Sequence, residues 1–164
     1  MKLRSSSPEH TERLGATLAS VLQPGDVMPL WGGFGAGKTT LVRGVARGLG
    51  FQGPVVSPSF GLVSEYPPST ESGTALYHLD LYRVGSEQEA LAFGVEDILG
   101  GDGICLIEWP GAVSELLPPD RLDLALEDAG GTNRRVLCRA TGERAQVLLG
   151  AYRARLTTLD AAGD

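Results

Sequence analysis

A glycine-rich octapeptide at residues 32–39 constrains the fold of this chain more than any other segment. It reads Gly-Gly-Phe-Gly-Ala-Gly-Lys-Thr and matches the pattern G-x-x-x-x-G-K-[ST]. An apolar run at residues 27–31 precedes it, and apolar residues recur at helical spacing over residues 39–49. This order of strand, glycine loop and helix is typical of a phosphate-binding loop, or P-loop.

The composition of the loop fits the binding of a nucleoside triphosphate. Glycines let successive backbone N–H groups turn toward phosphate oxygens, and the N-terminus of the following helix adds positive charge. The Lys38 ammonium is expected at the β and γ phosphates, and the Thr39 hydroxyl at Mg²⁺. We therefore predict a nucleotide-binding segment formed by Gly33, Phe34, Gly35, Ala36, Gly37, Lys38, Thr39 and Thr40.

The lysine content of the chain strengthens the assignment of Lys38. There are only two lysines, Lys2 and Lys38, against twelve arginines. An arginine fork is too bulky and planar for the place that a compact ammonium takes under the phosphates. Neither lysine stands in the Asn-Lys-x-Asp motif by which GTP-binding switches commonly read guanine. ATP with Mg²⁺ is therefore the expected nucleotide.

Two acidic residues are candidates for holding the metal and the attacking water. Glu108 ends an apolar run at residues 104–107, whose lack of polar alternation predicts a central strand covered on both faces. Ligands of open α/β sheets bind at such strand ends, and Glu108 stands where a Walker B acid is expected. Period-two alternation puts His78, Asp80 and Tyr82 on one face of another strand. This alternation alone leaves two interpretations of Asp80 open, a site residue and a solvent-facing edge strand.

Two further segments near these residues also have two interpretations. Ser57-Pro58-Ser59 follows the P-loop helix, where P-loop switches place a loop that senses the γ-phosphate. Ser57 or Ser59 could supply the sensing hydroxyl, although Ser-Pro-Ser is also an ordinary turn sequence. Trp109 and Pro110 similarly fit either a site or a strand end with a packed aromatic ring.

Length and charge narrow the class of protein. For 164 residues we expect one domain over residues 1–164, with residues 157–164 as a frayed tail. No apolar run reaches the roughly 20 residues of a membrane span and no apolar stretch follows the basic start, so a cytoplasmic protein is expected. The net charge of −6 argues against direct binding of nucleic acid, DNA included. Cys105 and Cys138 lack metal-ligand spacing and fit the apolar core.

The remaining hydrophobic pattern predicts an α/β fold. The expected helices lie at residues 8–22, from residue 86 onward and at 143–156, and the further strands at 60–66, 74–83, 121–127 and 134–139. The first two of these strands flank a turn-rich stretch and are expected to pair antiparallel. Together with the P-loop, the pattern predicts a P-loop NTPase-like three-layer sandwich with a mixed, mainly parallel central sheet.

Four motifs in this order resemble the TsaE (YjeE) family, the small P-loop ATPases of bacterial tRNA threonylcarbamoyladenosine synthesis. They are GGFGAGKTTLVRG at residues 32–44, VSPSF at 56–60, HLDLYR at 78–83 and LIEWP at 106–110. Their order and spacing agree with the family over residues 11–126. Two positions depart from the family pattern, because Gly33 stands where the family usually has Asp and Ser59 where it has Thr.

The resemblance implies roles for the candidate residues. It makes Lys38 and Thr39 ligands of phosphate and Mg²⁺, Glu108 a metal ligand, and Asp80 a residue needed for ATP hydrolysis. Lys38, Asp80 and Glu108 are then the expected catalytic residues, and Thr39, Asp80 and Glu108 the expected metal site.

The resemblance also implies a switch-like loop with Ser57 and Ser59, a site lined by Trp109, and a function. The family's role is to hydrolyse ATP, slowly when alone, while bound to the TsaD and TsaB subunits. These subunits carry threonylcarbamoyl transfer to adenosine 37 of tRNA, so tRNA is an indirect partner. Two alternatives remain: a small-molecule P-loop kinase, and a nucleotide-dependent docking module whose hydrolysis is incidental.

Overall fold

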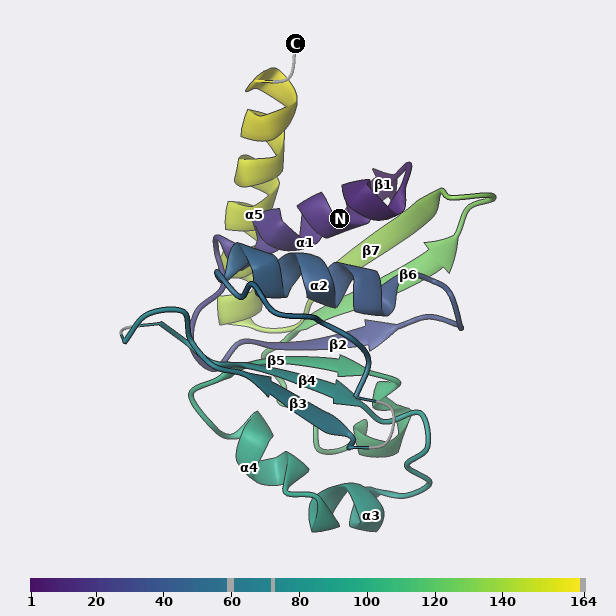
Figure 1. The fold of residues 1–164 in the computed structure, drawn as a ribbon, viewed down its shortest axis with the longest axis vertical. Coiled ribbons are helices and arrows are strands. Elements are labelled where there is room, and N and C mark those ends of the chain that lie inside the picture. Colours follow the sequence, from purple (N-terminus) through teal and green to yellow (C-terminus); the bar gives the residue numbers. More distant parts are fainter. Residues whose placement is uncertain (59–60, 72, 163–164) are drawn as a thin grey trace.

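A mixed sheet of seven strands lies at the centre of the computed structural model, which describes residues 1–58, 61–71 and 73–162 (Figure 1). The strands are β1 (Lys2–Ser5), β2 (Val27–Trp31), β3 (Val63–Tyr66), β4 (Leu76–Asp80), β5 (Ile104–Glu108), β6 (Leu122–Asp128) and β7 (Arg134–Ala140). The helices are α1 (Pro8–Ala19), α2 (Lys38–Gly48), α3 (Glu87–Ala92), α4 (Val95–Leu99), the 3₁₀ helix η1 (Pro110–Val113) and α5 (Glu143–Ala162). The strand order is β1-β7-β6-β2-β5-β4-β3.

Strand direction divides the sheet into a parallel centre and antiparallel margins. Neighbours among β6, β2, β5 and β4 are parallel, whereas the pairs β1–β7, β7–β6 and β3–β4 are antiparallel. Five of the seven described strands consequently run in the same direction. The predicted α/β sandwich with a mixed, mainly parallel sheet is confirmed, and so is the antiparallel pairing of β3 with β4.

Two apolar cores lie on opposite faces of the sheet. On one face α1, α2 and α5 cover a core that includes Leu18, Leu30 and Val45. On the other face α3, α4 and η1 cover a smaller core around Leu79 and Ile107 (Figure 1). All residues of β5 are buried, as expected for a parallel strand between two helical layers. The end of β5 is thereby held rigidly at the centre of the molecule.

A close contact between α1 and α2 holds the P-loop helix in place. Gly15 and Gly44 lie at this contact, where a Cβ on Gly44 would come within 2.1 Å of the Glu12 carbonyl oxygen. The Glu12 carboxylate forms ion pairs with Arg43 and Arg47 of α2. Because backbone touches backbone at this point, α2 has little freedom to move relative to α1.

The two ends of the chain differ from the sequence-based expectation. β1 is a strand that the sequence pattern did not predict, since four residues are too short for a periodicity and their stability comes from pairing with β7. α1 ends at Ala19, three residues before the expected end at Leu22. α5 continues past residue 156, so the tail expected at residues 157–164 is helical as far as Ala162. Hydroxyls of Thr157 and Thr158 bond to carbonyls one turn earlier in this extension.

Cys105 and Cys138 are buried free thiols in the apolar cores, which confirms their reading as packing residues. None of the helices in the described ranges is long and apolar enough to cross a membrane. Ser59, a predicted member of the switch-like loop, lies outside the described residues together with Phe60 and Ser72.

Candidate nucleotide-binding site

The P-loop joins β2 to α2 in a backbone conformation that requires glycine. Gly32, Gly35 and Gly37 have φ angles of 143°, 68° and 101°, which L side chains rarely adopt. A Cβ on Gly32 would also lie 2.5 Å from the Leu126 carbonyl oxygen. Gly37 precedes α2 and provides no side-chain cap, so the first N–H groups of α2 keep their hydrogen-bonding capacity for a ligand.

The Lys38 side chain lies back along the loop. Its Nζ donates hydrogen bonds to the carbonyl oxygens of Gly32 (2.7 Å) and Gly33 (2.8 Å), and it stands 4.0 Å from the centre of the Trp109 ring. The side chain is buried, and burial lowers the pKa of Lys38, whereas the nearby Glu108 and Asp80 carboxylates act in the opposite direction. A compact positive charge is therefore fixed inside the loop.

Glu108 occupies the end of β5, directly opposite the P-loop helix. Its Oε1 accepts a hydrogen bond from the Thr39 hydroxyl at 2.7 Å and lies 2.8 Å from His78 Nε2. Since a carboxylate accepts, Nε2 of His78 carries the proton. His78 is completely buried, and its Nδ1 has no hydrogen-bond partner among the described residues. This histidine therefore serves to orient Glu108.

Asp80 is brought beside Glu108 by strand register. β4 and β5 are parallel neighbours in which Asp80 pairs with Glu108, so the two carboxylates stand at the same edge of the sheet. Asp80 accepts hydrogen bonds from the Ser57 hydroxyl and from the Tyr82 backbone N–H. β4 lies between β5 and β3, and both its His78 and its Asp80 are buried. The solvent-facing interpretation of this strand is thus wrong, because β3 and the residues around the site cover it.

Three aromatic rings surround the entrance. Phe34, Tyr82 and Trp109 lie with ring centres 4.6–5.0 Å apart, in edge and tilted contacts. Trp109 has φ of 56°, a left-handed conformation that is strained for a residue with a side chain. Directly after β5, this strained residue places its indole over Lys38 rather than in the core. Phe34 is 73% exposed and forms the outer rim.

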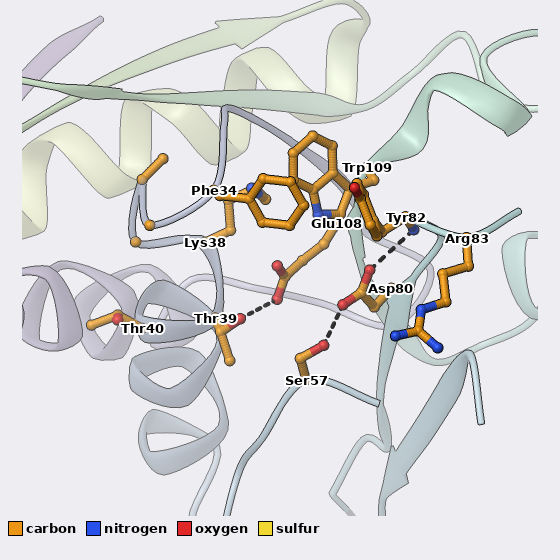
Figure 2. A pocket seen from close by; sticks show the side chains of 13 residues that line it. Phe34, Lys38, Thr39, Thr40, Ser57, Asp80, Tyr82, Arg83, Glu108 and Trp109 are labelled. Carbon is orange, nitrogen blue, oxygen red and sulfur yellow. Dashed lines mark hydrogen bonds between the residues drawn. The ribbon is translucent and has the colours of Figure 1, made fainter. Parts of the chain in front are cut away.

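A cavity of about 430 Å³ brings these side chains together (Figure 2). Most of the predicted site residues line it: Phe34, Gly35, Ala36, Gly37, Lys38, Thr39, Thr40, Ser57, Asp80, Glu108 and Trp109. Gly33 lies outside this lining, although its carbonyl oxygen binds Lys38.

The sequence assigned no definite site role to three residues that the structure places here, although Arg83 was one of the arginines available to supply charge at the phosphates. Tyr82 and Arg83 line the cavity, and His78 supports it from beneath. Their signal was the alternation around Asp80, which put His78 and Tyr82 on the face of that aspartate. Arg83 belongs to the opposite face by alternation, but β4 ends at Asp80, so the strand pattern no longer applies to it.

The oxygen donors in the cavity fit a magnesium ion. The Thr39 hydroxyl and the Glu108 and Asp80 carboxylates are hard ligands, which Mg²⁺ prefers. Among the described residues, no group of three or more His, Cys, Asp or Glu forms a metal cage. Mg²⁺ does not need one, because it binds with one or two carboxylates, phosphate oxygens and water.

The fold and the cavity together define the class of this protein. A P-loop connects a central parallel strand to a helix, and an acid at the end of the neighbouring strand contacts the P-loop threonine. This arrangement is that of the P-loop NTPase-like fold. The chain belongs to the family described as threonylcarbamoyl adenosine biosynthesis protein TsaE, whose family model matches residues 5–136. The resemblance seen in four sequence motifs is therefore confirmed.

Relatives and a solved structure agree with this family. The chain is 38% identical over 148 residues to the tRNA threonylcarbamoyladenosine biosynthesis protein TsaE of Bacillus subtilis, covering 90% of each chain. The protein of the same name from Treponema pallidum is 35% identical over 136 residues, which are 83% of this chain and 98% of the relative. The crystal structure of Bacillus subtilis YdiB superposes with a TM-score of 0.80 at 34% identity and 94% coverage of both chains.

Proposed function

We propose that this chain binds ATP with Mg²⁺ in the P-loop cavity and hydrolyses it in support of tRNA threonylcarbamoyladenosine synthesis in the cytoplasm. The observation that carries the proposal is the contact of Thr39 with Glu108 beside the buried Lys38. It places a hydroxyl, a carboxylate and an ammonium at one end of the cavity. A nucleoside triphosphate and its metal ion require these three groups.

The P-loop holds the phosphates in this proposal. Backbone N–H groups of residues 33–40 and the N-terminus of α2 bind phosphate oxygens, and Lys38 neutralises the β and γ phosphates. Thr39 and Glu108 would hold Mg²⁺, with Asp80 beside them, and the ion would supply positive charge to stabilise the γ-phosphate. The Trp109 ring keeps the Lys38 ammonium within the loop through a cation–π contact.

Asp80 orients the attacking water. Its carboxylate lines the cavity and accepts hydrogen bonds from the Ser57 hydroxyl and the Tyr82 N–H (Figure 2), and a carboxylate has acceptor capacity beyond these two bonds. A fixed carboxylate positions a water by accepting its proton in a hydrogen bond. Arg83 also lines the cavity and is the arginine that could add charge at the phosphates.

The surroundings give no support to a kinase that phosphorylates a small molecule. Such an enzyme needs arginines on a lid over an acceptor pocket. The arginines of β7 are used within the fold: Arg134 donates to the Gly35 carbonyl oxygen, Arg135 pairs with Glu127, and Arg139 stands 3.6 Å from Asp123. The proposal therefore keeps the role implied by the family, with TsaD and TsaB as partners and tRNA reached through them.

The experiment is reconstitution with the TsaD and TsaB proteins of the source organism, an activated threonylcarbamoyl donor and a tRNA transcript. We expect modified adenosine only when this chain, ATP and Mg²⁺ are all present, together with release of phosphate. Glu108→Gln should form the complex but support neither product. The proposed function would be wrong if tRNA were modified at the same rate without this chain as with it. It would also be wrong if modification proceeded at that rate without ATP hydrolysis.

A further inference from the structure

One half of the sheet is open on one face. α3, α4 and η1 cover the face formed by β3, β4 and β5, at the end of the sheet far from β1 and β7 (Figure 1). On the same face of β6, β7 and β1, the side chains point outward, and no described helix packs over them. We call this surface the open sheet face and define it by its central row, Trp31, Ala125, Leu137 and Lys2, with the charged residues that flank this row.

Strand register sets the central row. Trp31 of β2 pairs with Ala125 of β6, Ala125 pairs with Leu137 of β7, and Leu137 pairs with Lys2 of β1. Residues paired in this way share one face of a sheet. Trp31 is 36% exposed, and Ala125 and Leu137 are only partly buried. Trp31, Ala125 and Leu137 therefore form an apolar strip at the centre of the open sheet face, and Lys2 stands at the end of the row.

Basic residues flank the strip on both sides. On one side Arg4 pairs in register with Arg135, and Arg135 pairs with Glu127. On the other side Arg139 pairs in register with Asp123, and Arg121 lies next to it.

The charge of the open sheet face is opposite to that of the whole chain. Together with Lys2, the face carries five basic residues against two acids. Both acids are in ion pairs, Glu127 with Arg135, and Asp123 with Arg121 and Arg139. The chain as a whole has a net charge of −6. Such a local excess of positive charge attracts a surface of opposite sign.

Asp123 orders the residues on one side of the strip. Its Oδ1 accepts hydrogen bonds from Trp31 Nε1 (3.1 Å) and Arg121 Nε (3.3 Å), and its Oδ2 stands 3.6 Å from Arg139 Nη2. The same residues line a hollow of about 380 Å³ with Ala125 and Leu137. Because hydrogen bonds already hold Trp31 and Arg121 in place, binding through these two side chains costs less side-chain entropy.

We propose that the open sheet face is a docking surface for an acidic patch on a protein, with an apolar side chain seated on the strip. Tryptophan and arginine around an apolar centre are typical of strong protein contacts. RNA fits less well, since Asp123 and Glu127 would face its phosphates. The identity of the partner rests on the proposed function, which makes it part of the TsaD and TsaB pair.

Trp31 links this surface to the P-loop. It directly precedes Gly32, and it lines a second hollow whose other residues include Tyr82 and Trp109. Trp31 therefore belongs both to the open sheet face and to the surroundings of the nucleotide cavity. A partner seated on that face would contact the residue that precedes the P-loop without entering the cavity.

The test is a double charge reversal, Lys2→Glu with Arg4→Glu. Neither side chain has an ion pair among the described residues, so the fold and the ATP affinity should stay unchanged. The matched control is Arg153→Glu with Arg155→Glu on exposed positions of α5, which changes the total charge equally. Biolayer interferometry measures the affinity of each variant for the TsaD and TsaB pair. The affinity of each variant for a tRNA transcript alone is measured in the same way.

We expect the β1 variant to lose at least about tenfold in affinity for the protein pair, and the α5 control less than about twofold. Equal losses in both variants, or none in the β1 variant, would overturn the surface assignment while leaving the proposed function standing. Loss of tRNA binding alone would make the face an RNA surface instead. No binding of the pair by the unmodified chain would overturn the proposed function, and the partner assignment with it.

Discussion

The Thr39 hydroxyl donates a hydrogen bond of 2.7 Å to the carboxylate of Glu108, 69 positions further along the chain. Thr39 lies in the first turn of α2 and Glu108 ends β5, so this bond joins the P-loop helix to a neighbouring parallel strand. The same carboxylate oxygen stands 2.8 Å from His78 Nε2. Hydroxyl and carboxylate are thus oriented toward each other at the place where the proposal puts a metal.

Glu108→Gln should separate metal use from nucleotide binding. The amide keeps the shape of the side chain and loses the charge, so ATP hydrolysis in Mg²⁺ should fall by about 100-fold or more. Affinity for ATP in EDTA should change by less than about twofold, since the phosphates are held by the loop. Phosphate release and calorimetry measure the two quantities. The exposed Glu115→Gln serves as control, and full Mg²⁺-dependent turnover in Glu108→Gln would exclude the glutamate from the mechanism.

Asp80→Asn should stop turnover while leaving ATP and Mg²⁺ bound. An amide oxygen accepts a hydrogen bond from the attacking water more weakly than a carboxylate does, and it cannot take up the proton. We therefore expect the single-turnover rate to fall by about 100-fold. Ser57→Ala removes one hydrogen bond to that carboxylate and should cost less, about tenfold. Rapid-quench experiments that follow the hydrolysis of bound ATP measure the single-turnover rate of both variants. A larger loss for Ser57→Ala than for Asp80→Asn would contradict this order of roles.

Lys38→Ala should weaken ATP binding. A hydrogen bond to a charged group contributes about 1.5–3 kcal/mol, so the dissociation constant should rise by about 10- to 100-fold. The matched control is Lys2→Ala, which removes the chain's other lysine. Calorimetric titration with ATP compares the two variants with the unmodified chain. Similar affinities for all three would remove Lys38 from the site.

Cys105 and Cys138 should resist alkylation in the folded protein. Burial raises the pKa of the Cys105 thiol from 9.0 to about 12 and that of Cys138 to about 11, so neither is a thiolate near neutral pH. Both thiols should react once urea unfolds the chain, and mass spectrometry counts the adducts. The unfolded thiols ionise at lower pH than the folded ones, so their contribution to stability is complete below about pH 9 and is lost toward pH 11–12. Rapid labelling of either cysteine at pH 7.5 without urea would contradict its burial.

Several elements could be predicted because their signals are local. The P-loop is one contiguous segment, and the apolar run before Glu108 identified a central strand from its own composition. β1 could not be found in this way, since four residues become a strand only by pairing with β7, about 130 positions later. The role of His78 was also hidden. Its signal was a position beside Asp80, and only the contact with Glu108 gives it a function.

The sequence alone determined which chemical groups this protein has, namely a glycine loop, one well-placed lysine and two acids at strand ends, because these features depend on residue type and spacing. Only the tertiary structure decided how they meet. Parallel register places Asp80 beside Glu108, the close contact of α1 with α2 fixes the helix that carries Thr39, and the left-handed backbone of Trp109 places its ring at Lys38. Such contacts join residues far apart in the chain, and their geometry follows from how the layers pack around the sheet.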